Sequence, residues 1–317
     1  MNLLSTAVVL PALVQLVLFL IVSPLVTGVI RTLKARLQMR QGPPIWQPYL
    51  ELHKLMRKGM VIPDTASWLF SLTPYVVFLT AAMVGLMIPM VATQAPLSLF
   101  GGVLAVVYLL ALGRFFLALA GLDTGSSFGG LGSSREMTIS AIAEPAMMVA
   151  IFTVAIAANS TNLSEVARSA IGQSWRFLAP SQMLAFGALF IVLIAETGRI
   201  PVDNPATHLE LTMIHEAMIL EYSGPYLALI EWAASLKQLV LMTLLVNTFF
   251  PFGLSPDWNA AGVAIGLGFY LLKLLAISCC IVLVETTNAK MRLFRVPELL
   301  AVAFILGALA LISTFLF

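Results

Sequence analysis

Long apolar runs recur along the whole chain and limit the folds that it can adopt. They cover residues 4–30, 68–93, 98–121, 137–158, 180–197, 226–250, 260–285 and 296–317. A helix needs roughly 20 apolar residues to cross a bilayer, where every backbone polar group must find an internal partner. The sequence therefore predicts an all-α integral membrane protein, with about eight transmembrane helices in a single transmembrane domain over residues 1–317.

The composition supports this fold class and excludes others. Hydrophobic residues make up 60% of the chain and charged residues only 10%, which is too few to cover a soluble protein of this size. The net charge of +2 and the lack of a basic run argue against nucleic acid as a partner. The first apolar run lacks the charged start and cleavage site of a signal peptide, so we expect a retained span.

The placement of Lys and Arg predicts the orientation in the membrane. Of the seventeen such residues, twelve lie in the odd-numbered loops between the predicted spans, and only Arg168 and Arg176 lie in loops on the other side. Cytoplasmic loops carry the excess of Lys and Arg. We therefore expect a multi-pass protein of the cell (inner) membrane with its N-terminus outside and three notable cytoplasmic loops: 32–66, 122–136 and 196–224.

The first of these loops, 32–66, is basic and contains a predicted amphipathic helix. Gly42-Pro43-Pro44 forbids helix continuation, and apolar and charged residues alternate after it at helical spacing. Such a helix lies in the membrane interface, with its cations facing lipid phosphates or a partner protein. A simple anchor to anionic lipid explains the same pattern, so both interpretations stay open.

The loop at 196–224 carries the densest group of ionisable residues. It holds five of the fifteen carboxylates and two of the three histidines. Its carboxylates are Glu196, Asp203, Glu210, Glu216 and Glu221, and its histidines are His208 and His215. Because charge is expensive in hydrocarbon, such a stretch between two spans indicates a functional site.

Several further charges lie within or at the edges of the predicted spans. They are Arg114, Glu144, Glu231, Lys237, Lys273 and Glu285. A buried charge costs several kcal/mol unless it is paired or hydrated. The residues therefore form either structural ion pairs between helices or a hydrated row that relays protons, with Glu196 and Asp203 at its cytoplasmic mouth.

The sequence offers no evident site for a metal or redox centre. Cys279 and Cys280 are adjacent inside an apolar run and lack the spacing of zinc or iron–sulfur ligands. His208 and His215 are seven residues apart and share a helical face beside Glu216, but no Glu-x-x-His motif recurs to complete a carboxylate cage. We therefore predict no metal site in this chain.

Three loop motifs together resemble the subunit 1 family of respiratory complex I. These are Glu196-Thr-Gly-Arg199-Ile-Pro201-Val-Asp203 followed by Glu221-Tyr-Ser-Gly224, the Gly/Ser-rich stretch from Gly121 to Arg135-Glu136, and Arg40-Gln-Gly-Pro43. The resemblance covers nearly the whole chain. Val202 stands where quinone-reducing members have Phe, and Asn204-Pro-Ala-Thr-His208 replaces most of their acids. This form resembles the branch found in membrane-bound nickel–iron hydrogenases and formate hydrogenlyase-type complexes.

The resemblance implies a function and a set of site residues. It implies a membrane subunit that docks a peripheral redox arm and links electron transfer to proton or sodium translocation. It also implies a proton or coupling role for Glu144, Glu196, Asp203, Glu210 and Glu221. The charge pattern described above adds further candidates for the same role, namely Glu216, His208, His215, Lys237, Lys273 and Glu285. An arm-docking role is expected for Arg40, Arg135, Arg199 and Asp123.

The implied partners would carry all the redox centres of the complex. We expect hydrogenase-like large and small subunits, an iron–sulfur subunit and antiporter-like membrane subunits, with the clusters and a nickel–iron or related site in those partners. The chain also contacts membrane lipid. Two alternatives remain open, namely the quinone-binding subunit 1 of a respiratory NADH dehydrogenase and a free-standing secondary transporter.

Overall fold

The computed structural model describes residues 6–171, 179–204, 213–256 and 258–316, and it is helical throughout most of them. The α-helices are α1 (Thr6–Leu37), α2 (Gln47–Met56), α3 (Trp68–Met87), α4 (Val103–Asp123), α5 (Ser127–Ala157), α6 (Leu163–Ile171), α7 (Pro180–Glu196), α8 (His215–Ile219), α9 (Gly224–Phe249), α10 (Ala260–Thr287) and α11 (Val296–Leu316). Short 3-10 turns cover Ser98–Phe100 and Leu293–Arg295. Within these described ranges, seven helices are long and apolar enough to span a membrane, and α7 is a shorter apolar helix. The prediction of an all-α membrane protein with about eight spans is confirmed.

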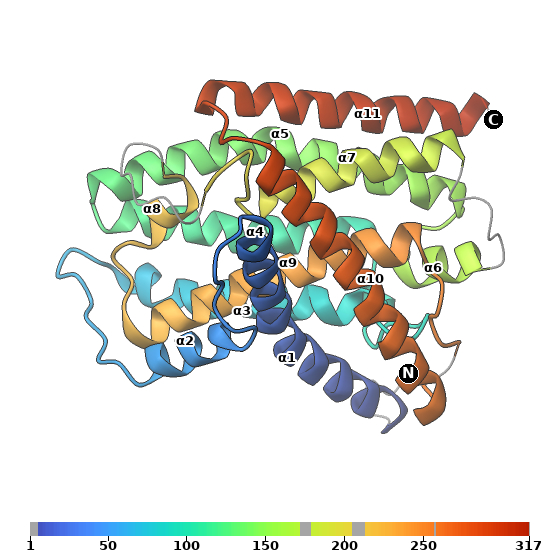
Figure 1. Cartoon of the computed structure of the whole chain (residues 1–317), viewed down its shortest axis with the longest axis horizontal. Coiled ribbons are helices and arrows are strands. Elements are labelled where there is room, and N and C mark those ends of the chain that lie inside the picture. The colour runs from blue at the N-terminus through green and yellow to red at the C-terminus, as the bar shows by residue number, and fades with distance from the viewer. Residues whose placement is uncertain (1–5, 172–178, 205–212, 257, 317) are drawn as a thin grey trace.

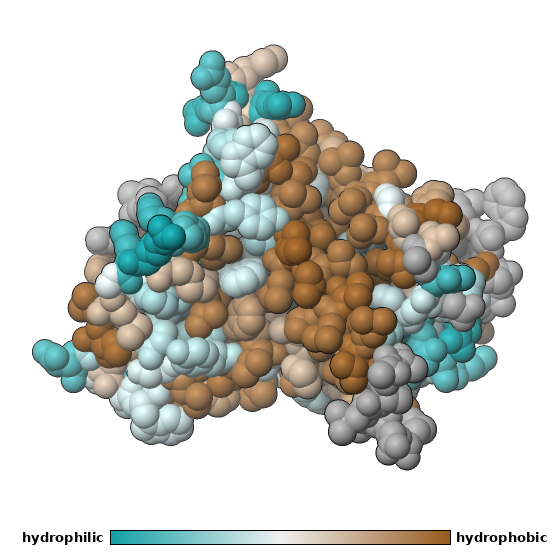
Figure 2. Space-filling model, turned by 90° about the horizontal axis from the view of Figure 1, so that it is seen from below, coloured by the Kyte–Doolittle hydropathy of each residue, from teal (hydrophilic) through white to brown (hydrophobic). Residues whose placement is uncertain are grey.

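The helices form a bundle in which most members run side by side along the long axis (Figure 1). Helix α5 packs against α4, α7 and α11, and α3 packs against α4 and α9. Helices α1 and α10 cross the others at an angle and pack against each other (Figure 1). Apolar side chains cover the middle of the face in Figure 2, and more polar ones lie toward its margins, as expected for lipid contact.

The two ends of the bundle differ in chemistry. We call the end that carries α2, α8 and the C-terminal ends of α4, α7 and α10 the charged end, and the opposite one the far end. At the far end the non-helical residues 88–93 pair with the segment after α9. The amide of Thr93 donates to the carbonyl of Ser255, and the amide of Ser255 donates to the carbonyl of Val91, both over 2.9 Å.

Helix α2 confirms the amphipathic helix predicted after the first span. Trp46 and Leu50 are exposed, while Pro48 is buried near the helix start. The hydroxyl of Tyr49 donates to the carbonyl of Ile21 in α1 and ties α2 to that span. The segment 32–66 is only partly a loop, because α1 continues to Leu37.

The prediction of a Gly/Ser-rich loop over 122–136 is wrong for most of that segment. Only residues 124–126 leave the helical structure, and α5 begins at Ser127. A Cβ atom on Gly129 would lie 2.2 Å from the carbonyl oxygen of Gly121, and one on Gly132 would lie 2.8 Å from the Cβ of Ala217. The glycines therefore allow close helix packing, a common use of small residues in membrane bundles.

This packing makes a testable prediction about Gly129. In Gly129→Ala the new methyl group would meet backbone, so α4 and α5 must separate at a cost of about 1–3 kcal/mol. We expect the thermal unfolding temperature in detergent to fall by several degrees. Gly130→Ala is the matched control, because its Cβ would have no neighbour nearer than 4.0 Å. Equal stability of the two variants would contradict this account of the glycines.

Candidate functional site

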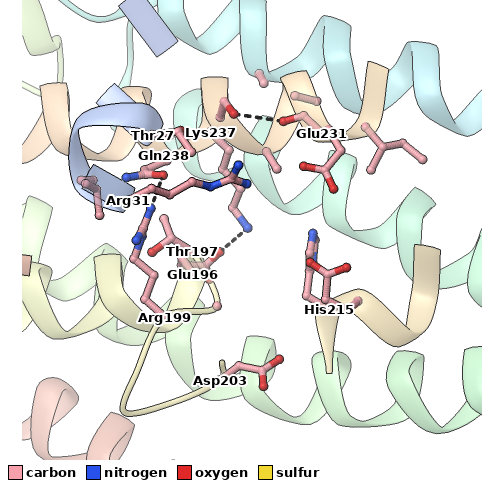
Figure 3. A pocket seen from close by; sticks show the side chains of 18 of the residues that line it. Thr27, Arg31, Glu196, Thr197, Arg199, Asp203, His215, Glu231, Lys237 and Gln238 are labelled. Atoms are coloured by element: carbon pink, nitrogen blue, oxygen red, sulfur yellow. Dashed lines mark hydrogen bonds and ion pairs between the residues drawn. The ribbon is translucent and has the colours of Figure 1, made fainter. Parts of the chain in front are cut away.

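A cavity of about 560 Å³ opens at the charged end. Side chains from α1, α4, α9 and α10 and from the turn after α7 line it. In Figure 3 Lys237 points toward Glu196 and Arg199 points toward Gln238, while Glu231 and His215 lie on another side of the same space. The cavity therefore collects groups from spans that are far apart in the sequence.

Four charged residues form one chain of ion pairs, which we call the Glu196 chain. Arg114 on α4 lies 2.5 Å from Glu196 and 3.1 Å from Glu144 on α5, and Lys237 on α9 lies 2.8 Å from the other oxygen of Glu196. The side chains of Arg114 and Glu196 are almost fully buried, whereas that of Glu144 is 30% exposed. Two acids and two bases alternate, so the chain is electrically neutral.

A second set of contacts, the Glu285 group, lies beside the first. Glu285 on α10 is within 2.7 Å of both Arg199 and Lys34. Arg199 also donates to the side-chain oxygen of Gln238 over 2.8 Å. Because Gln238 follows Lys237 on α9, this helix joins the Glu285 group to the Glu196 chain. Arg199 lies in the turn after α7, three residues beyond Glu196.

Asp203 fixes the end of the same turn. Its carboxylate lies 2.6 Å from Lys290 in the loop before α11, and it accepts from the amides of Asn204 and Ile214 over 2.8 and 3.2 Å. The amide of Met291 adds a bond to the carbonyl of Pro201. The turn that carries Glu196, Arg199 and Asp203 is therefore linked to α4, α9, α10 and the α10–α11 loop.

Other predicted site residues line the cavity without an ion pair. Glu216 and His215 at the start of α8 are half-buried, and they have no ion-pair partner among the described residues. In the same described ranges, Glu136 on α5 and Glu231 on α9 also line the cavity unpaired. Arg40 is exposed at the cavity margin. Glu136, Glu216 and Glu231 thus add acidic groups to the lining, which also contains Arg31 and Lys34 of α1.

The structure does not bring all the predicted residues together. Glu221 is exposed and does not line the cavity. Lys273 lies elsewhere on α10 and bonds to the end of α9. Arg135 donates to the carbonyl of Met213 over 2.9 Å, and Asp123 accepts from the amide of Ser67 over 2.8 Å. His208 and Glu210 lie outside the described residues.

Sequence reasoning missed three members of the network. Lys34, Lys290 and Gln238 were not singled out, because the first two were counted only as loop cations and the third is uncharged. The available signal for Lys34 is the helical pattern, which continues past residue 30 and so keeps this lysine on α1.

Within the described ranges, no three His, Cys, Asp or Glu side chains gather in a way that could hold a metal ion. Cys279 and Cys280 are free thiols on the exposed side of α10. Tyr222, next to Glu221, donates its hydroxyl to the carbonyl of Phe70 over 2.9 Å. Burial raises the pKa of Tyr222 above its ordinary value, so this hydroxyl stays protonated and holds the loop to α3.

Known proteins resemble the chain over almost its full length. It is 36% identical to hydrogenase-4 component C of Escherichia coli K12, covering 94% of this chain and 93% of that protein. It is 33% identical to formate hydrogenlyase subunit 4 of the same organism, covering 96% and 98%. Identity to an NADH-quinone oxidoreductase subunit of Rubrobacter xylanophilus is 28%, over 76% of this chain and 74% of that protein.

The fold matches a chain in the structure of the membrane-bound sulfane sulfur reductase, an archaeal respiratory membrane complex. The TM-score is 0.85 with 20% identity, over 97% of this chain and 99% of that one. Residues 10–316 match the family model described as NADH dehydrogenase. These comparisons confirm the resemblance found in the loop motifs, and the chain is a multi-pass membrane member of the NADH dehydrogenase family with relatives in two hydrogenase-type systems.

Proposed function

We propose that this chain is the membrane-anchoring and coupling subunit of a complex I-like, hydrogenase-type oxidoreductase. The observation that carries the proposal is the short turn 197–203, which ties Glu196 and Arg199 to two buried ion-pair groups and Asp203 to a third contact. A peripheral redox arm that moves this turn would change the pairing of charges inside the membrane. The relatives in two hydrogenase-type systems support the same function.

The geometry supports a simple coupling mechanism. Glu196 shares its charge between Arg114 and Lys237, and Glu285 shares its charge between Arg199 and Lys34. If the turn withdraws one partner, the remaining buried charge is left uncompensated, which costs about 3–5 kcal/mol. Uptake or release of a proton restores neutrality. Redox-driven motion of the turn thus drives proton or sodium movement, in concert with antiporter-like membrane partners.

The redox centres belong to the partner subunits in this proposal. The arm carries the iron–sulfur clusters and a nickel–iron or related site, and it rests on the charged end near Arg40, Asp123 and Arg135. The structural roles of Asp123 and Arg135 are compatible with docking, because both fix loops at that end. This end faces the cytoplasm in the proposed orientation.

Quinone binding is a second candidate function, favoured by the cavity itself. Its volume of about 560 Å³ is in the range of small-molecule sites, and apolar residues such as Ile30, Val77 and Leu110 line part of it. The higher identity to the hydrogenase-type relatives than to the quinone oxidoreductase relative favours the first proposal.

The coupling role predicts a selective defect in Glu196→Gln. The amide cannot balance both Arg114 and Lys237, so we expect ion translocation to fall about tenfold or more, while electron transfer to an artificial acceptor stays intact. Translocation is measured in vesicles containing the whole complex.

Glu144→Gln, which alters a more exposed end of the same chain of ion pairs, provides a second variant if Glu196→Gln does not assemble. Glu221→Gln is the control, since this exposed acid lies outside the cavity. Parental translocation in both Glu144→Gln and Glu196→Gln would identify these acids as structural.

The docking surface is tested by reversing exposed cations at the charged end. The double variant Arg40→Glu and Arg57→Glu should release the arm, because like-charge contacts at an interface cost several kcal/mol. Co-purification in mild detergent measures the loss. Arg168→Glu reverses an exposed cation at the far end and should retain the arm. Retention of the arm by the double variant would rule out this surface.

The orientation is tested by labelling introduced cysteines in intact cells, with Cys279 and Cys280 replaced by Ala. Leu220 at the charged end and Thr161 at the far end are both exposed. Thr161→Cys should react with an impermeant maleimide, and Leu220→Cys should react only after the membrane is opened. The reverse pattern would show that the charged end is outside.

A further inference from the structure

Lys273 differs from the other cations inside the bundle. It lies near the middle of α10, and its ammonium group donates to the side-chain oxygen of Asn247 over 3.1 Å and to the carbonyl of Phe250 over 2.8 Å. In the described part of the chain it has no acidic partner, whereas Arg114, Lys237 and Arg199 each contact a carboxylate. Its acceptors are neutral and lie at the C-terminal end of α9.

This environment allows Lys273 to change its protonation state without breaking an ion pair. An ammonium group has three N–H donors, and the neutral amine keeps two, which is enough for both observed acceptors. A lysine paired with a buried carboxylate would leave that acid uncompensated when it lost its proton. The carbonyl at the end of α9 also carries the negative end of the helix dipole, which holds the cation when it is protonated.

Buried polar groups lie on α9 and α10 near Lys273. The hydroxyl groups of Tyr270 and Thr243 are 2.6 Å apart, and either can donate. On α10, Tyr270, Ser278 and Glu285 are separated by eight and seven residues, close to two helical turns each, so they share one face. Ser278 is fully buried. This face runs from the Glu285 group to Tyr270, three residues before Lys273. Tyr270 meets Thr243, which is one turn of α9 nearer the charged end than Asn247.

On the far-end side, Lys273 is linked through Asn247 to non-helical backbone. Asn247 donates to the carbonyls of Pro89 and Met90 over 2.8 and 2.9 Å, in the non-helical segment that follows α3. Asn247 and Met90 are buried. Non-helical backbone at membrane depth is tolerated only where protein covers it or where it lines a hydrated passage. Asn247 therefore joins Lys273 to backbone that reaches the far end.

We propose that Lys273 is a proton-carrying residue at the far end of a polar path along α9 and α10. The ammonium group releases a proton to water at the far end. The amine that remains takes up a proton delivered through the hydroxyl groups of Tyr270 and Thr243 from the Glu285 group, so that one proton crosses and the lysine is restored. This inference rests on the proposed function, since it supplies an exit for the charge that the ion-pair groups move.

Lys273→Arg separates a proton-carrying role from a structural one. The guanidinium keeps the positive charge and the donors but cannot be deprotonated in a protein. We expect assembly to be retained and proton translocation, followed with a pH-sensitive dye in vesicles of the whole complex, to fall at least tenfold. Lys54→Arg on α2 is the matched control and should translocate at the parental rate. Parental translocation by Lys273→Arg would show that Lys273 only caps α9.

Tyr270→Phe provides an independent test, because it removes one hydroxyl group and leaves the ring in place. We expect translocation to fall in this variant as well, and a parental rate would reject the path even if Lys273→Arg failed to assemble. Glu196→Gln in the same assay shows whether the proton path or the proposed coupling function has failed. If this variant loses translocation while Lys273→Arg and Tyr270→Phe keep it, only the path is wrong. If the parent complex moves no protons, the proton path is overturned, and a sodium assay on the same vesicles then decides the proposed function.

Discussion

The burial of Glu196 between Arg114 and Lys237 is the interaction on which the rest of the site depends. It lies at the last residue of α7 and joins α4, α7 and α9, which are separated by long stretches of sequence. Burying the Glu196 carboxylate without a cation would cost several kcal/mol of folding free energy. Without that carboxylate, Arg114 and Lys237 would repel each other. The spans can therefore pack at the charged end only with all three side chains in register, and the turn that follows is positioned as a result.

The same constraint explains why the turn after α7 can act on the membrane interior. Glu196, Arg199 and Asp203 lie within eight residues of one another, yet their partners are on α4, α9, α10 and the loop before α11. A displacement of this turn cannot relieve one contact without straining the others. In the proposed mechanism, this shared set of contacts converts a small motion of the turn into a change of charge state.

The sequence predicted the spans and most of the charged residues, because apolar length and the scarcity of charge are properties of local sequence. It could not predict which charges pair, since pairing depends on how helices pack. Glu285 and Arg199 are 86 residues apart, and Lys34 was assigned to a loop although α1 carries it. The prediction of a loop in the Gly/Ser-rich segment was wrong for a related reason. Gly129 and Gly132 suggest a loop, but they are required where α5 meets α4 and α8.

Two lysines inside the bundle, Lys237 and Lys273, differ in whether the loss of a proton would leave a buried carboxylate unpaired. Lys237 contacts Glu196 and completes a neutral chain, so losing its proton would expose a buried carboxylate. Among the residues that the structure describes, Lys273 contacts an amide oxygen and a backbone carbonyl, both of which can accept from the ammonium and from the neutral amine. Residues of the same type therefore have opposite consequences for proton exchange. What decides between them is whether the partner carries a charge of its own, a property fixed by packing rather than by the sequence around each lysine.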